Sequence, residues 1–141
     1  MKTLKSILAG IALLFVCVAA NATVKPTTDA LTRDDVVNIY IDAIAKGNIS
    51  DLNKVLDDSF QYNMQRGDNV NTLNKDQLLN YLKNNSTVDP SVTTTTSLVQ
   101  EDIDAATIKV EFKYSDYTRV DRITLNKASG WVITSVTTST K

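Results

Sequence analysis

Arg119 and Asp121 are the two residues of this sequence whose types and spacing are best suited to carry chemistry. Residues 117–125 are rich in β-branched and aromatic residues, which predicts a strand that returns beside residues 106–114. The alternation of residues 106–114 predicts that their even-numbered positions point inward, and the returning strand then turns its odd-numbered positions inward: Tyr117, Arg119, Asp121, Ile123 and Leu125. A charge in that apolar interior needs a partner, or its proton affinity shifts.

Two interpretations of Asp121 follow. In the first, Asp121 is a general base or a ligand anchor, assisted by a tyrosine hydrogen-bond donor. The candidate donors are Tyr40, Tyr62, Tyr81 and Tyr114. In the second, Asp121 is a satisfied polar group that is paired with Arg119 or with a tyrosine hydroxyl.

The aromatic residues of the chain suggest a stacking pocket for a small apolar or aromatic ligand. Together with Arg119 and Asp121, the candidate ligand-binding residues are Tyr40, Tyr62, Tyr81, Phe112, Tyr114 and Trp131. The alternative is that these aromatic side chains simply fill the core.

Residue types that are missing narrow the chemistry further. The chain has no histidine and one cysteine, Cys17. Thiol nucleophiles, Ser-His-Asp chemistry and the usual zinc sites are therefore excluded from residues 23–141. We expect no metal and no cofactor, and a non-catalytic role is favoured over an enzymatic one.

The first 22 residues have the features of a cleaved signal peptide. Lys2 and Lys5 precede a short apolar run, and Ala20-Asn21-Ala22 fits the small-x-small cleavage rule. We therefore expect an exported protein, periplasmic or secreted, with no membrane anchor after cleavage. Without these two lysines the chain has 13 of its 15 basic residues against 16 acidic ones, which gives a net charge of −3. Because of this negative charge we expect no nucleic-acid partner.

The remaining chain predicts a loose arm over residues 23–31 and one domain over residues 32–141. Thr32 with Asp35 predicts the start of a first helix that ends at Gly47. A short second helix is predicted after a Ser50 cap, a strand from Phe60 to Met64, and a third helix after Asn74 with Leu78, Tyr81 and Leu82 on its inner face. Four antiparallel strands are expected over residues 92–103, 106–114, 117–125 and 131–138.

This order predicts an α+β domain with three N-terminal helices packed on the concave face of a curved, mostly antiparallel β-sheet. Two motifs carry a resemblance: Val37-x-x-Tyr40-x-x-Ala43-x-x-x-Gly47-Asn48-x-x-x-Leu52, and Asp121-x-Ile123-x-Leu125 followed by Gly130-Trp131-x-Ile133. The chain resembles the nuclear-transport-factor-2-like superfamily, a cystatin-like α+β cone. It is most similar to exported bacterial members described as SnoaL-like or lumazine-binding, over about residues 33–136.

The resemblance implies a pocket between the helices and the concave sheet, and dimerisation through the sheet. On the outer sheet face we expect Lys109, Glu111 and Lys113 beside four residues of the later strands: Val120, Arg122, Val132 and Val136. Exposed valines there favour a homodimer. Three hypotheses remain: a small-molecule-binding or accessory domain, an isomerase- or dehydratase-like enzyme using Asp121 with a tyrosine, and a structural or protein-interaction module whose cone is filled.

Overall fold

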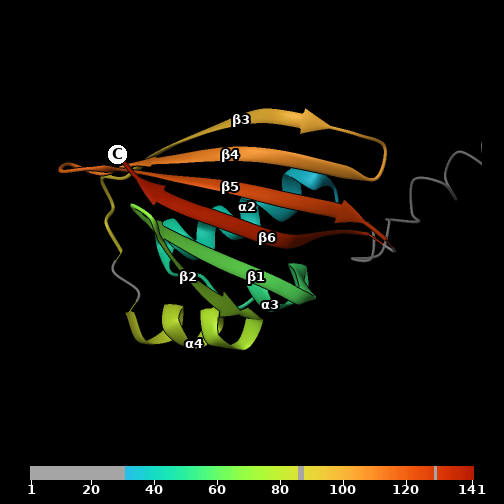
Figure 1. Ribbon diagram of the computed structural model, residues 1–141, viewed down its shortest axis with the longest axis horizontal. Coiled ribbons are helices and arrows are strands. Elements are labelled where there is room, and N and C mark those ends of the chain that lie inside the picture. Colours follow the sequence, from blue (N-terminus) through green and yellow to red (C-terminus); the bar gives the residue numbers. More distant parts are fainter. Residues whose placement is uncertain (1–30, 86–87, 129) are drawn as a thin grey trace, which may run out of the picture. The chain divides into compact units, whose positions relative to one another are not determined.

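The computed structural model describes residues 31–85, 88–128 and 130–141. The predicted signal peptide and all but the last residue of the predicted arm lie outside these ranges. The described residues form three helices and six strands, with the helices on one side of a single sheet (Figure 1). The predicted α+β architecture is confirmed.

Helix α2 (Arg33–Lys46) begins and ends where the sequence predicts. Thr32 and Asp35 form a reciprocal capping box, in which the Asp35 amide donates to Thr32 Oγ1 at 3.1 Å and the Thr32 amide donates to Asp35 Oδ2 at 3.0 Å. Gly47 ends the helix with φ 72°, a left-handed conformation that costs glycine little. This helix packs on the sheet and places Tyr40 in the core.

The next two helices follow the predicted order with one different cap. Helix α3 (Leu52–Val55) has Asp51 at its N-cap position, so the predicted Ser50 cap is wrong. Ser50 Oγ instead donates to Asn48 Oδ1 at 2.9 Å. Helix α4 (Lys75–Asn85) has the predicted Asn74–Gln77 capping box, with both hydrogen bonds 2.9 Å long.

The six strands lie in the order β2-β1-β6-β5-β4-β3. Their bounds are β1 (Leu56–Arg66), β2 (Asn69–Asn74), β3 (Thr93–Glu101), β4 (Ala105–Lys113), β5 (Thr118–Lys127) and β6 (Trp131–Thr140). All neighbours are antiparallel except β1 and β6, which are parallel. Strand β1 starts at Leu56 rather than Phe60, and β2, which pairs with it across the Gly67 turn, was not predicted.

The inward positions of β4 and β5 are those that the alternation predicts. Ile108, Val110 and Phe112 are buried, and their partners on β5 are respectively Ile123, Asp121 and Arg119. In β6 the alternation breaks, because the pairing register with β5 shifts after Thr124. This bulge puts Ile133 and Val136 on the same buried face, so the prediction that Val136 lies on the outer face is wrong.

Candidate functional site

The most unusual feature of the core is a buried charged group held by tyrosines. Asp121 is fully buried and is the only charged or polar residue in the buried class among the described residues. Arg119 donates to it twice, from Nε to Oδ1 and from Nη2 to Oδ2, at 2.8 Å each. Tyr40 Oη donates to Asp121 Oδ2 at 2.6 Å. Both carboxylate oxygens are therefore engaged, and Asp121 is paired with Arg119 and a tyrosine hydroxyl together.

Arg119 itself is held by more than the carboxylate. Its Nη2 also donates to Tyr62 Oη at 2.6 Å. Its guanidinium carbon lies 5.5 Å from the Phe112 ring centroid and 6.0 Å from that of Tyr62, within cation–π range. Four elements, α2, β1, β4 and β5, thus converge on one arginine.

This environment shifts the proton affinity of the groups around the ion pair. Burial raises the pKa of Tyr40 well above its usual value, and the nearby Asp121 charge raises it further. Burial raises the pKa of Tyr62 to about 12, although the Arg119 charge opposes this. Burial is the largest single effect on Arg119 and lowers its pKa, but Asp121, Tyr40 and Tyr62 together more than offset burial and raise the pKa of Arg119 well above its usual value. At neutral pH both tyrosines are protonated and Arg119 is charged.

A hollow of about 350 Å³ opens beside this group, and we call it the mouth pocket. Its walls come from the end of α2, from α4, from the segment after α4 and from the β4–β5 turn, and Arg119 is part of its lining. Tyr114 and Tyr117 of that turn stack on each other, with ring centroids 4.8 Å apart. Among the described residues no hydrogen bond uses Arg119 Nη1, so this nitrogen can donate to a molecule in the pocket.

The predicted site residues divide into three groups. Tyr40, Tyr62, Phe112, Arg119 and Asp121 come together in the core. Tyr81 and Tyr114 line the mouth pocket with Arg119, but Tyr81 is 45 % exposed rather than part of an inner helix face. Tyr117, predicted to point inward, lies in the turn and is 47 % exposed.

Trp131 is the third group. It packs against the core opposite Lys127, whereas Arg119 lies opposite Thr140 at the other end of the same strand pair. Eight residues of strand separate the two, roughly 26 Å. The predicted single pocket with Trp131 and Arg119 together is therefore wrong.

Asp89 and Asp116 line the mouth pocket and were not among the predicted site residues. Asp116 lies between two of the predicted strands, and Asp89 lies in a segment without strand or helix periodicity. Asp89 accepts from the Ser91 amide at 2.9 Å and from Ser91 Oγ at 2.6 Å, and these bonds lower the pKa of its carboxyl. Nothing in the sequence pattern places these carboxylates near Arg119; only the fold does.

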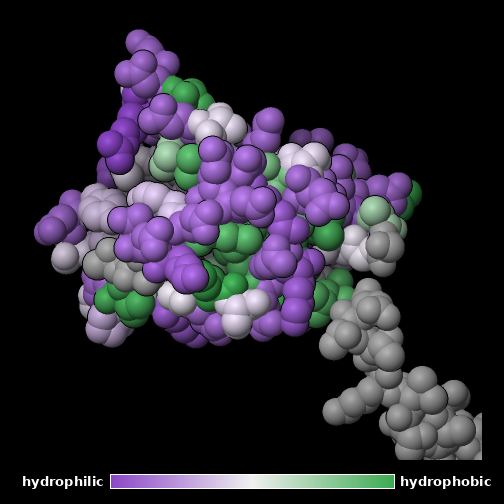
Figure 2. All heavy atoms as spheres, turned by 90° about the horizontal axis from the view of Figure 1, so that it is seen from below, coloured by the Kyte–Doolittle hydropathy of each residue, from purple (hydrophilic) through white to green (hydrophobic). Residues whose placement is uncertain are grey.

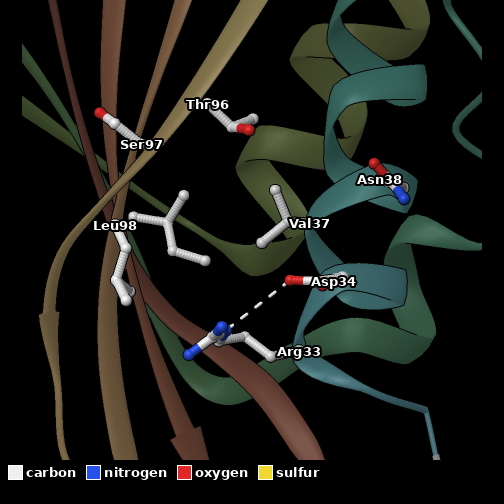
Figure 3. Close-up of a pocket in the computed structure, with 8 residues that line it drawn as sticks. Arg33, Asp34, Val37, Asn38, Thr96, Ser97 and Leu98 are labelled. Carbon is white, nitrogen blue, oxygen red and sulfur yellow. Dashed lines mark ion pairs between the residues drawn. The ribbon is translucent and has the colours of Figure 1, made fainter.

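A second hollow, the α2–β3 groove, lies between the helix and the edge strand (Figure 3). Its volume is about 370 Å³, and a further 630 Å³ hollow continues it along α2, sharing Asn38 and Thr96. Arg33 reaches into it, donates from Nη1 to Glu101 at 2.6 Å and lies 3.7 Å from Asp34. The groove contains no aromatic side chain among its described lining residues, so the mouth pocket is the better candidate for a ring-shaped ligand.

Two negative findings complete the site. In the part of the chain that the structure describes, no group of three or more acidic side chains could hold a metal ion. None of the helices described is long and apolar enough to cross a membrane.

Comparison with known proteins gives one family and many structures. The family model described as "putative lumazine-binding" matches residues 28–137, and no curated protein matches the chain. A cystatin-like fold protein from Burkholderia xenovorans is similar with a TM-score of 0.63 and 15 % identity, over 82 % of this chain and 93 % of that one. A nuclear-transport-factor-2-like protein of unknown function from Silicibacter pomeroyi has a TM-score of 0.61 and 16 % identity, over 77 % and 92 %.

A third structure carries an enzyme's name. A ketosteroid isomerase-like protein from Erwinia carotovora atroseptica is similar with a TM-score of 0.61 and 15 % identity, over 81 % of this chain and 97 % of that one. Identities this low establish the shared fold alone.

Proposed function

The chain belongs to the family described as "putative lumazine-binding", within the nuclear-transport-factor-2-like superfamily, and we propose that it is an exported domain that binds a small molecule in the mouth pocket. This proposal rests on the position and hydrogen bonds of Arg119. Its guanidinium is fixed by Asp121 and Tyr62, while its Nη1 has no hydrogen bond among the described residues and the arginine lines the hollow. A donor held this rigidly is pre-organised for a ligand acceptor atom.

The charges around the mouth pocket define the class of ligand. Asp121 already neutralises Arg119, and Asp89 and Asp116 add negative charge at the rim. A carboxylate or phosphate ligand would meet these acids without a free cation to balance it. A neutral, flat heterocycle fits better, with a carbonyl oxygen toward Arg119 and N–H groups toward the aspartates. Its ring would lie near Tyr114 and Tyr81.

The role we propose is non-catalytic. A general base needs an oxygen that a substrate proton can reach, and Asp121 is fully buried with both oxygens hydrogen-bonded. This geometry does not favour the isomerase- or dehydratase-like alternative, despite the name of the ketosteroid isomerase-like neighbour. The cone interior is filled by Tyr40, Phe60 and Phe112, so the ligand would be confined to the mouth.

The proposal includes export and self-association. The basic start, apolar run and small-residue cleavage motif of residues 1–22 support a periplasmic or secreted location. A homodimer through the outer sheet face has weaker support than the sequence suggested. With Val136 inside, Val120 and Val132 remain there, both half-buried, beside the Lys109–Glu111 ion pair.

The test is a calorimetric titration of the protein with lumazine and with a carboxylated lumazine. We expect saturable binding of lumazine and weaker binding of the carboxylated ring. Arg119→Gln should weaken binding about ten- to a hundredfold, the effect of losing one hydrogen bond from a charged donor. Because this variant also disturbs a buried pair, Tyr117→Ala at the exposed rim is a second pocket variant that leaves the core intact.

Arg33→Gln, in the α2–β3 groove, is the matched control and should bind as the unaltered protein does. The proposal is wrong if neither ring binds saturably, or if both pocket variants bind with unchanged affinity. Preferred binding of the carboxylated ring would overturn the charge argument.

A further inference from the structure

The two edges of the sheet are covered to different extents. The β2 edge is six residues long, and helix α4 packs against it and β1 (Figure 1). Seen from below, hydrophilic side chains surround a small apolar patch (Figure 2). The β3 edge is nine residues long, and every one of its residues is exposed. Residues 93–99 include no charged residue and no proline, the usual features that keep an edge strand from pairing.

The backbone groups of β3 point to the open edge at alternate residues. At the β4–β5 turn the Tyr114 amide donates to the Tyr117 carbonyl at 2.9 Å. Pairs that exchange hydrogen bonds alternate with pairs that do not, so the even-numbered residues of β4 bond to β5 and its odd-numbered residues bond to β3. These odd-numbered residues lie opposite odd-numbered residues of β3 over residues 93–97. The amides and carbonyls of Thr94 and Thr96 therefore point away from β4, to the open edge.

The same two threonines have their side chains on the groove side of the sheet. Thr94 and Thr96 lie opposite Phe112 and Val110, buried residues of β4, so they share the inner face. They form part of one wall of the α2–β3 groove, and Thr96 borders both of its hollows (Figure 3). A strand added at this edge would place every second side chain over the groove.

The two hollows are suited to aliphatic side chains. Val37 and Ile108 line the first hollow, and Ile41, Ala45 and Val92 line the second. Successive inward residues of one strand are about 7 Å apart, so two neighbouring inward side chains can occupy the two hollows that meet at Thr96. A branched aliphatic residue such as valine is of suitable size and polarity for each.

Acidic residues outnumber basic ones along the groove. Among the described residues, the two hollows and the ion pair at their end hold two basic residues, Arg33 and Lys46, against four acids: Asp34, Asp42, Asp89 and Glu101. Arg33 already binds Glu101 at 2.6 Å, and Lys46 lies 3.0 Å from Asp42. The two lysines of β4 are odd-numbered and belong to the outer face. The excess of acid favours a basic partner, whereas a second copy of this edge would add acid to acid.

We propose that the β3 edge and the α2–β3 groove bind an extended basic segment of another protein, which pairs antiparallel with β3 as a seventh strand of the sheet. Backbone hydrogen bonds to Thr94 and Thr96 fix its register, and two of its aliphatic side chains enter the hollows. Its basic residues lie at the two ends of the groove, near Asp34 and Asp89. Of the described lining residues, this site shares only Asp89 with the mouth pocket, so it is a second binding site with a different class of ligand.

The probe is the peptide acetyl-Lys-Thr-Val-Thr-Val-Thr-Lys-amide, in which both lysines and both valines share one face of a strand. Calorimetric titration of the protein with this peptide should give one saturable site, and binding should weaken as the salt concentration rises. The same peptide with glutamate in place of both lysines is the control. It should bind weaker by about tenfold or more, because its charges repeat those of the groove.

Two variants test where the peptide binds. Thr96→Lys should weaken binding of the lysine peptide by about tenfold or more, because the new side chain occupies the boundary between the hollows and adds a like charge. The matched control, Thr95→Lys, adds the same charge on the outer face of the same strand and should change the affinity by less than about threefold. Circular dichroism of each variant confirms that its fold is intact.

Methylated peptides test the backbone pairing. N-methylation of the two valine amides, which point to β3 in the antiparallel arrangement, should abolish binding, and N-methylation of two threonine amides should not. The proposal is wrong if the lysine peptide does not bind, and a dimeric mass by light scattering would then identify a second copy as the occupant. It is equally wrong if the glutamate peptide binds as tightly, if Thr96→Lys leaves the affinity unchanged, or if the two methylated peptides bind alike.

Discussion

Asp121 is fully buried, so no water solvates its carboxylate, and Arg119 beside it is mostly buried. Two hydrogen bonds from Arg119 and one from Tyr40 replace that solvation for the carboxylate. Removing one charge of such a pair costs more than the pair itself contributes, because the remaining charge stays buried without a partner. The pair therefore fixes the position of Arg119 in the mouth pocket, and a substitution of either residue is expected to destabilise the protein.

Asp121→Asn should lower the free energy of unfolding by about 3–5 kcal/mol, since it leaves the Arg119 charge uncompensated in the core. Urea denaturation followed by circular dichroism measures this. Asp116→Asn, on the exposed β4–β5 turn, is the control and should change stability by less than about 0.5 kcal/mol. A loss of the same small size for Asp121→Asn would mean that the buried pair is not a structural element.

The raised pKa of Tyr62 predicts that the folded protein loses stability at alkaline pH. Its pKa is about 12 in the folded protein against the usual value of 10.0. The folded state holds the proton more tightly, so this contribution is complete below pH 10 and is lost as the pH rises toward 12. The free energy of unfolding should fall there by about 1.4 kcal/mol per pH unit for this group.

The matching measurement is urea denaturation at several pH values between about 9 and about 12. Tyr62→Phe should reduce the slope, while Tyr40, whose pKa is also raised by burial, keeps a slope of its own. If Tyr62→Phe and the unaltered protein lose stability with the same slope, Tyr62 does not hold its proton as described.

At the scale of single residues, strand alternation in the sequence predicts which way Arg119 and Asp121 point. Periodicity does not predict the exposure of Tyr81, which lies three positions after Leu78 at the margin of the buried face of α4, nor that of Tyr117, because a turn has no strict periodicity. Asp89 comes close to Arg119 only through tertiary folding, which no local pattern encodes.

Local side-chain hydrogen bonds mark where α2 and α4 begin. Thr32→Ala should destabilise the protein by about 1 kcal/mol, because the Asp35 amide loses its acceptor at the start of α2. Thr32→Ser retains an Oγ in the same place and should recover most of that loss. Thermal unfolding of the three proteins checks this, and equal losses in the alanine and serine variants would show that the cap hydrogen bond is not the cause.

Other elements could not be predicted from periodicity. The β6 bulge moves Val136 to the inside, and one inserted residue leaves no mark on a run of threonines, serines and valines. Strand β2 is rich in asparagine, a residue that is uncommon in strands, and it forms because the Gly67 turn aligns it with β1. Tertiary pairing overrides local propensity in both places.

Across the whole molecule, burial decreases from the centre of the sheet toward β3. Strands β5 and β6 have hydrogen-bonded neighbours on both sides, whereas β3 has only β4 and is exposed along its length. The parallel β1–β6 pairing joins the first half of the chain to the last strand, so the centre of the sheet cannot form until the whole domain is present. Local opening of the sheet should require the least free energy at the β3 edge.

Amide hydrogen exchange should follow this gradient. We expect the slowest exchange in β5 and β6 and the fastest strand exchange in β3, with β2 intermediate because α4 packs on it. Mass spectrometry of peptides from the two edges separates these outcomes. Exchange in β3 as slow as that in β5 would contradict the picture of an open edge strand.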